Sequence, residues 1–216
     1  MPETISKKLL EVQDKLETSS RSYITFFNFS VDYGKGSTTV DMDGNVFIDW
    51  FGGFSVMNLG EGHPVVMEAL RSQLEKITHI TEVPIEARIR YLKTLNSVLL
   101  GKMKDHSKVL MTVTGADACE AAVSLTRYNS KKPKIIAFSG SYHGIAGGIV
   151  GATLNYHYRD YAGYATQNYV YVPFPYPYRF DSKIGKEDIS EEVISKIKEM
   201  INAPLLRSSF SWGDYK

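Results

Sequence analysis

The residues with the clearest chemical potential lie in the turn Thr114-Gly115-Ala116-Asp117, between an apolar run and a helix of small residues. Thr114 and Asp117 have the spacing at which a hydroxyl and a carboxylate cap each other's backbone donors. A glycine-containing turn at the start of a helix also leaves N–H groups at the positive end of the helix dipole. The pattern predicts a cup that binds a phosphate group, and the alternative is an ordinary turn between a strand and a helix.

A second candidate group is the loop Ser141-Tyr142-His143-Gly144, which follows another short apolar run. If both apolar runs are parallel strands, their carboxyl ends meet at one edge of the sheet, where ligands bind in such folds. The phosphate cup and the Tyr142–His143 pair would then face one crevice. A phosphate joined to a flat aromatic body fits such a crevice, with the ring of Tyr142 stacked on it.

Motifs for other chemistries fail on spacing. The sequence contains no Gly-x4-Gly-Lys, which excludes a P-loop, and neither Gly34-Lys35-Gly36 nor Gly60-Glu61-Gly62 has the third glycine of a dinucleotide fingerprint. Ser141 lacks the glycine two residues earlier that a nucleophile elbow needs. The 5 histidines show neither helical pairing nor companion carboxylates at ligand spacing, so no metal site is predicted. Four of them are expected to be surface or structural groups, and His143 is the functional candidate.

The composition is that of a folded protein with balanced charge. Of 216 residues 43% are hydrophobic, and 25 basic residues against 24 acidic residues leave a net charge of +1. This balance gives no reason to expect nucleic acid or a membrane surface as a partner. The single cysteine, Cys119, excludes an internal disulfide framework and is expected to pack as a small apolar residue. With no signal peptide and no apolar run of membrane-spanning length, we expect a cytoplasmic protein.

The order of elements predicts an α/β fold with a mainly parallel sheet and flanking helices. Periodicity predicts helices at 3–18, 64–77, 82–104, 115–127 and 186–201, and strands at 109–113, 134–138 and 169–172. Two alternating runs within 32–49 predict a hairpin that turns at Asp43-Gly44. The glycine-rich segment 52–62 predicts backbone brought close to a ligand or to a neighbouring chain.

Three stretches, in the same order, resemble the class III aminotransferases, the pyridoxal-phosphate enzymes that include 4-aminobutyrate, ornithine and diaminobutyrate transaminases. The first is residues 41–64, which begin Asp-Met-Asp-Gly-Asn and end Gly-Glu-Gly-His-Pro. The second is residues 114–122, Thr-Gly-Ala-Asp-Ala-Cys-Glu-Ala-Ala, and the third is Ser141-Tyr142-His143-Gly144. Three ordered motifs are far more specific than any one of them.

The resemblance implies the first part of a fold type I aminotransferase, with an incomplete parallel sheet. Residues 1–62 would be an N-terminal segment of the small domain, and residues 63–204 a partial large domain that binds the cofactor. The family also implies a homodimer of the full-length protein, with an amino donor and a 2-oxo acid as small-molecule partners.

Carried over by position, the resemblance implies that Gly115 and Ala116 offer backbone donors to the phosphate of pyridoxal phosphate. Tyr142 would stack on the pyridine ring, with His143 beside it. Many family members have serine or threonine where this sequence has Ala116, so one hydroxyl contact to the phosphate is missing.

For the substrate, the resemblance implies that Phe54 and Val56 face it near the dimer interface, and the alternative is plain packing under the small domain. Family members are nearly twice as long, and their Schiff-base lysine, the acid that pairs with the pyridinium nitrogen and the arginine that grips the substrate lie in the second half. We therefore assign no catalytic residue. The lysines after Tyr142 match nothing in the family: Lys183, Lys186, Lys196, Lys198 and Lys216.

Two functions follow from the sequence. One is a class III transaminase that moves an amino group from an ω-amino or diamino acid to 2-oxoglutarate, and the other is a non-catalytic fragment or one half of a split enzyme. Residues 205–216 are polar where the family continues with an apolar strand, so we expect this tail to be out of frame or to end a truncated gene copy. Because a shortened sheet has an unpaired edge, we expect the isolated chain to be poorly soluble or to need a partner.

Overall fold

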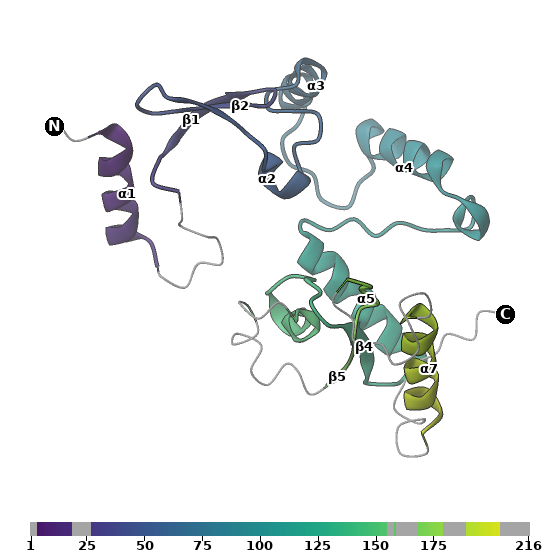
Figure 1. The fold of residues 1–216 in the computed structure, drawn as a ribbon. Coiled ribbons are helices and arrows are strands. Elements are labelled where there is room, and N and C mark those ends of the chain that lie inside the picture. Colours follow the sequence, from purple (N-terminus) through teal and green to yellow (C-terminus); the bar gives the residue numbers. More distant parts are fainter. Residues whose placement is uncertain (1–3, 19–26, 155–157, 159–167, 179–188, 204–216) are drawn as a thin grey trace. The chain divides into compact units, whose positions relative to one another are not determined.

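The computed structural model describes residues 4–18, 27–154, 158, 168–178 and 189–203 (Figure 1). The chain divides into two compact units, residues 1–94 and 95–216, and each is described by itself. The domain boundary expected after residue 62 stays a prediction. So does the origin of the tail at 205–216, which lies outside the described residues.

The first unit contains a three-stranded antiparallel sheet in the order β1-β2-β3. Its strands are β1 (Val31–Lys35), β2 (Thr38–Asp41) and β3 (Val46–Ile48). The Asp41 carboxylate fixes the turn between β2 and β3, because it accepts the N–H groups of Asp43 at 2.9 Å and of Asn45 at 2.7 Å. The hairpin predicted within 32–49 is confirmed, and a further turn at Gly36 divides its first run into two strands.

Helix α1 (Ile5–Leu16) is anchored on that same turn. The Asp43 carboxylate accepts the N–H groups of Ile5 at 2.7 Å and of Ser6 at 3.0 Å. Hydrogen bonding to Ser6 is the largest of the effects that hold the pKa of Asp43 below its usual value. The apolar face of this helix is largely exposed, with Leu9 at 45% and Val12 at 53% exposure. The helix is thus held by its first turn, and within the described residues its apolar face stays open.

The glycine-rich segment 52–62 lies against the chain's own first hairpin. Gly36 and Glu61 exchange two backbone hydrogen bonds, of 2.8 and 2.9 Å. A side chain at Gly60 would place its Cβ 2.9 Å from the Cα of Gly36, so the approach requires glycine. The predicted close approach is confirmed, but its partner here is the turn between β1 and β2 rather than a ligand or a second chain.

Helices α3 (Pro64–Leu74) and α4 (Glu86–Val98) follow, with the short 3-10 turn η1 (Gly101–Met103) after them. Pro64 occupies the first turn of α3, as the sequence predicts. The helix expected over 82–104 is shorter at both ends. It begins two residues after Pro84, and it stops before Gly101, whose φ of 57° belongs to the left-handed region.

The second unit is built on the parallel pair β4 (Ile135–Phe138) and β5 (Tyr169–Val172), with Ile135 opposite Tyr169 (Figure 1). Helix α5 (Gly115–Ser130), the 3-10 helix η2 (Gly147–Ala152) and helix α7 (Ile189–Asn202) complete it. Both strands and both α-helices confirm the sequence prediction to within three residues at each described end.

The core of the second unit lies where α5 and η2 meet the two strands. Its fully buried members come from three of these elements: Ala137, Ile149, Ala152 and Tyr169. Helix α5 packs on this cluster through Ala116, Cys119 and Val123, which share one helical face. Cys119 is therefore a half-buried core residue, as predicted, and the face that buries it also carries Ala116 of the candidate cup.

The strand predicted at 109–113 is wrong. These residues form no strand in the described part of the chain, and their side chains are open to solvent, with Leu110 74% exposed and Val113 96% exposed. A strand exists only through hydrogen bonds to a neighbour, and no described segment pairs with this one. The apolar pattern thus indicates a segment that needs covering, and the described residues provide no cover for it.

A helix that crosses a membrane must be both long and apolar. Across the part of the chain that the structure describes, no helix is both long enough and apolar enough to cross a bilayer.

Candidate functional site

The turn before α5 is fixed by a reciprocal cap between Thr114 and Asp117. The Asp117 carboxylate accepts both the N–H of Thr114, at 3.2 Å, and its hydroxyl, at 2.8 Å. The Thr114 hydroxyl oxygen in turn accepts the N–H of Asp117 at 3.1 Å. The predicted cap is confirmed, and it decides which donors are left over. Among the described residues no acceptor faces the N–H groups of Gly115 and Ala116 at this positive end of a 16-residue helix.

The loop after β4 is tied to the end of η2 by hydrogen bonds in both directions. The N–H of Leu154 donates to the carbonyl of Ser141 at 2.8 Å, and the Ser141 hydroxyl donates to the carbonyl of Ala152 at 2.8 Å. The N–H of His143 donates to the hydroxyl of Thr153 at 3.0 Å. The loop backbone is thereby fixed, while the rings of Tyr142 and His143 remain exposed.

Gly144 brings this loop onto α5. A side chain at position 144 would collide with Ala116, placing its Cβ 2.9 Å from the Ala116 Cα, and the φ of 106° at Gly144 also disfavours any other residue. One turn further along α5, the carboxylate of Glu120 lies against Gly148, where an added Cβ would be 3.3 Å from Oε1. The loop and the helix thus meet at two points.

A pocket of about 450 Å³, which we call the cup, lies between these two elements. Its lining residues come from both sides: Thr114, Gly115, Ala116, Cys119, Tyr142, His143, Gly144, Ile145 and Ala146. The structure therefore brings together all four residues that the sequence singled out for a cofactor. Their roles toward a ligand remain predictions.

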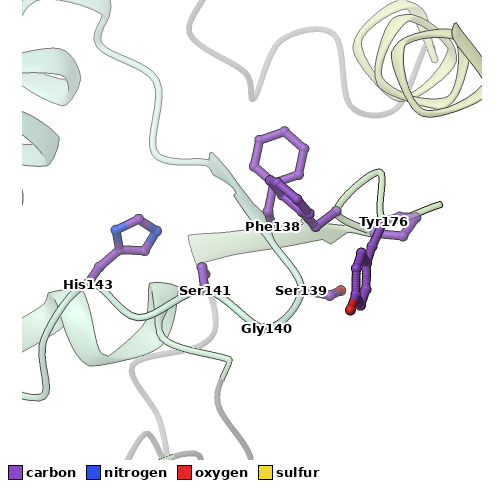
Figure 2. Close-up of a pocket in the computed structure, with 8 residues that line it drawn as sticks. Phe138, Ser139, Gly140, Ser141, His143 and Tyr176 are labelled. Atoms are coloured by element: carbon purple, nitrogen blue, oxygen red, sulfur yellow. The ribbon is translucent and has the colours of Figure 1, made fainter. Parts of the chain in front are cut away.

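A larger pocket of about 740 Å³ lies beside the cup, at the carboxyl ends of β4 and β5 (Figure 2). Aromatic rings dominate its wall, with Phe138 and Phe174 in edge contact at 6.1 Å between ring centres and Tyr176 further along. Figure 2 shows His143 on one side of Ser141 and Tyr176 on the opposite side, beyond Ser139. Because His143 lines both pockets, it stands between them.

The cup has few charged groups. Of its lining side chains only His143 can carry a positive charge, so an anion would be held by backbone N–H groups and the helix dipole. No described lysine lines the cup. Lys196, one of the late lysines considered from the sequence, lies on α7 and pairs with Glu192 at 2.7 Å. The described residues also hold no cluster of three or more potential metal ligands.

Phe54 and Val56 belong to the first unit and lie on its surface, with 74% and 76% of their side chains exposed. Helix α2 (Gly52–Ser55) is a left-handed turn at this point, in which Phe54 has a φ of 58° and Ser55 a φ of 66°. Such angles cost roughly 1 to 2 kcal/mol for each non-glycine residue. The alternative of burial by packing is not observed in the described residues, and the role of both residues beside a substrate stays a prediction.

Sequence reasoning placed Gly144 in a motif without its contact to α5, and it missed Thr153 altogether. The motif names Gly144 but does not indicate its contact with Ala116. Thr153 follows a short run of small and apolar residues and belongs to no motif. Only the tertiary hydrogen bonds of its buried hydroxyl reveal it.

The sequence is similar to those of known proteins. A sequence model of the family described as aminotransferase class-III matches residues 18–205. The diaminobutyrate–2-oxoglutarate transaminase of Bordetella parapertussis is 32% identical over 199 residues, which are 90% of this chain and 43% of that protein. An alanine/serine racemase of Pyrococcus horikoshii is 28% identical over 91% of this chain and 41% of its own length. This chain thus spans less than half the length of the curated relatives that it matches.

The structure is also similar to a solved one. The taurine:2-oxoglutarate aminotransferase of Bifidobacterium kashiwanohense, solved in complex with PLP and glutamate, superposes with a TM-score of 0.81 at 20% identity. The similarity covers 97% of this chain and 47% of that one.

Proposed function

This chain belongs to the class III aminotransferase family and has the fold of the first part of a fold type I transaminase, and from that premise we propose that it forms the pyridoxal-phosphate-binding portion of such an enzyme. The observation that carries the proposal is the cup, in which a capped helix start and an aromatic loop face the same pocket. The reaction would transfer an amino group from an ω-amino or diamino acid to 2-oxoglutarate, in keeping with the names of the transaminase relatives.

The phosphate end of the cofactor fits the helix start. The cap engages the N–H groups of Thr114 and Asp117, so those of Gly115 and Ala116 are the donors that can bind phosphate oxygens. Because Ala116 has no hydroxyl, this half of the anchor consists of backbone donors and the helix dipole.

The ring of the cofactor fits the opposite wall. Tyr142 is 56% exposed and can offer a face to a flat ligand, and His143 lines the same pocket beside it. Pyridoxal phosphate, when bound, supplies the electron sink that lets an amino group move between carbon skeletons. In this chain the residues of the cup bind and orient it.

Covalent attachment is the step that no described residue supports, since no described lysine lines the cup. A second candidate function therefore stands: a non-catalytic fragment, or one half of a split enzyme that works with a complementary chain. For the complete enzyme we propose a homodimer in the cytoplasm.

Titration with pyridoxal phosphate followed by borohydride separates these functions. We expect the chain to bind the cofactor reversibly in the cup and to lose it on dialysis, even after reduction, because no described lysine lines the cup. A lysine that carries the reduced cofactor, found by peptide mass analysis, would instead show that this chain completes the covalent site by itself.

Cys119 gives an independent measure of where the cofactor binds. It lines the cup and is the single cysteine of the sequence. Alkylation should slow at least about fivefold when the cup is filled, because access to the thiol governs the rate. Equal alkylation rates with and without bound cofactor would place the ligand elsewhere and refute the proposal.

A further inference from the structure

Thr153 has no place in any sequence motif, yet it is among the most buried polar residues described, at 1% exposure. It follows η2 with an extended backbone, φ −82° and ψ 116°. Its hydroxyl oxygen accepts the N–H of His143 at 3.0 Å, and its hydroxyl hydrogen goes to the carbonyl of Gly144 at 2.6 Å. One hydroxyl thus satisfies a donor and an acceptor on two successive residues of the loop.

These two bonds fix the part of the loop that matters for the cup. Gly144 is the residue that contacts Ala116, and Tyr142 and His143 directly precede it. The other bonds of the loop join its first residue, Ser141, to the end of η2. Between Ser141 and the helix contact, the Thr153 hydroxyl is the side-chain group that sets the path of the backbone.

We propose that Thr153 is the positioning residue of the cup, and that it holds Tyr142 and His143 opposite the N–H groups of Gly115 and Ala116. The identity of the ligand in this inference rests on the proposed function. Thr153 does not line the cup, so it acts through the loop and not by contact with the cofactor.

Removal of the hydroxyl isolates this role. Thr153→Val keeps the shape and the β-branched backbone preference, but leaves the N–H of His143 and the carbonyl of the buried Gly144 without their partner. Thr153→Ser keeps the hydroxyl and loses only a methyl group. Thr126→Val, at an exposed threonine of α5, is the matched control.

The first measurement is amide hydrogen exchange resolved by NMR, which needs no ligand. In Thr153→Val the His143 amide should exchange about tenfold faster, while the amides of β5 keep their rates. Thr153→Ser and Thr126→Val should match the wild type. An unchanged His143 rate, or an equal acceleration across β5, would overturn the inference. If Thr153→Val does not fold, exchange in the wild type still tests the inference. The hydrogen-bonded amide of His143 should exchange more slowly than the amide of Tyr142, and equal rates would refute the hydrogen bond to Thr153.

The second measurement compares two ligands. Inorganic phosphate needs only the helix start, whereas pyridoxal phosphate also needs the loop. Thr153→Val should weaken pyridoxal phosphate binding about tenfold and leave phosphate binding within about twofold, and Thr153→Ser should restore both. Equal weakening of both ligands would indicate general loosening and overturn the inference. Failure of the wild type to bind pyridoxal phosphate would refute the proposed function instead, and the exchange experiment would still decide the role of Thr153.

Discussion

Two apolar runs in this chain have the same sequence pattern and different structures. Residues 109–113 and strand β4 are both rich in large apolar residues, and both end at a turn that contributes to the cup. Strand β4 pairs with β5, and its Ala137 is 5% exposed. Residues 109–113 pair with no described segment, and Val113 is 96% exposed.

The difference teaches that an apolar run specifies a need for cover, whereas a strand requires a particular neighbour. β4 has its neighbour within this chain, about 30 residues further on. The run at 109–113 is the element of the second unit whose partner is missing from the described residues. An exposed, unpaired run of this kind is also a site where another chain can pair or aggregate.

The largest expected effect is the difference in stability when an aspartate is introduced into each of the two runs. Ala137→Asp would place a charge in the buried cluster with Ile149 and Tyr169. We expect it to destabilise the second unit by about 4 kcal/mol, because a buried carboxylate without a partner is costly. Met111→Asp, at a side chain that is 52% exposed, should change stability by less than about 0.5 kcal/mol.

The stability of the second unit in both variants can be measured by native-state amide exchange of β4 and β5, or by urea unfolding followed by limited proteolysis. The comparison fails if Met111→Asp is as damaging as Ala137→Asp, since residues 109–113 would then have a buried structure in solution. Better solubility of Met111→Asp would further indicate that this run causes self-association.

The turns that follow the two runs can be compared by glycine substitution. Gly144→Ala should cost about 2 to 3 kcal/mol and open the cup, because the new methyl group collides with Ala116 and the backbone has a φ of 106°. Gly115→Ala is the control, because an added Cβ there meets no atom within 4 Å. Thermal unfolding would measure the stability of both variants. Equal stability of the two variants would mean that the loop does not rest on α5.

Much of this arrangement could be predicted from the sequence. The reciprocal cap at Thr114 follows from residue spacing, and strand β5 follows from the alternation of aromatic and β-branched residues. Such local rules succeed because they involve neighbouring residues only. The two loops line one pocket although the strand predicted before the first of them is not formed in the described residues, since the loop after β4 rests on α5.

The rest could not be predicted because it depends on contacts between distant residues. The partner of the glycine-rich segment is Gly36, and nothing in the spacing of Gly60 indicates it. Likewise, the hydroxyl of Thr153 matters only because the chain returns to the loop ten residues after His143. What covers α1 is likewise beyond the sequence, since an amphipathic pattern predicts an apolar face but not its partner, and in the described residues this face is exposed.

The next prediction concerns the reciprocal cap between Thr114 and Asp117, which follows residues 109–113. Thr114→Ala removes the hydroxyl that accepts the N–H of Asp117, and it should destabilise α5 by about 1 kcal/mol. The freed donor and carboxylate should also disturb the phosphate site, lowering phosphate affinity several-fold. Thr126→Ala, in the interior of the same helix, controls for the loss of a threonine. Circular dichroism and phosphate titration would measure both, and an unchanged phosphate affinity would mean that the cap does not organise the donors.

The smallest expected effect concerns Tyr169 on β5, the strand that pairs with β4, and it appears only at high pH. Burial raises the pKa of Tyr169 above its usual 10.0, so the folded protein keeps a proton that the unfolded chain loses. The stability due to this group is therefore fully present below about pH 10 and is lost as the pH rises through the folded pKa. The Tyr169→Phe variant has no hydroxyl at this position and keeps every other tyrosine, so it is the matched control. Between pH 8 and pH 11 the wild type should lose more of its unfolding free energy than Tyr169→Phe. Equal losses would show that the Tyr169 hydroxyl reaches solvent, and that Tyr169 is less buried in solution than its 7% exposure in the structure indicates.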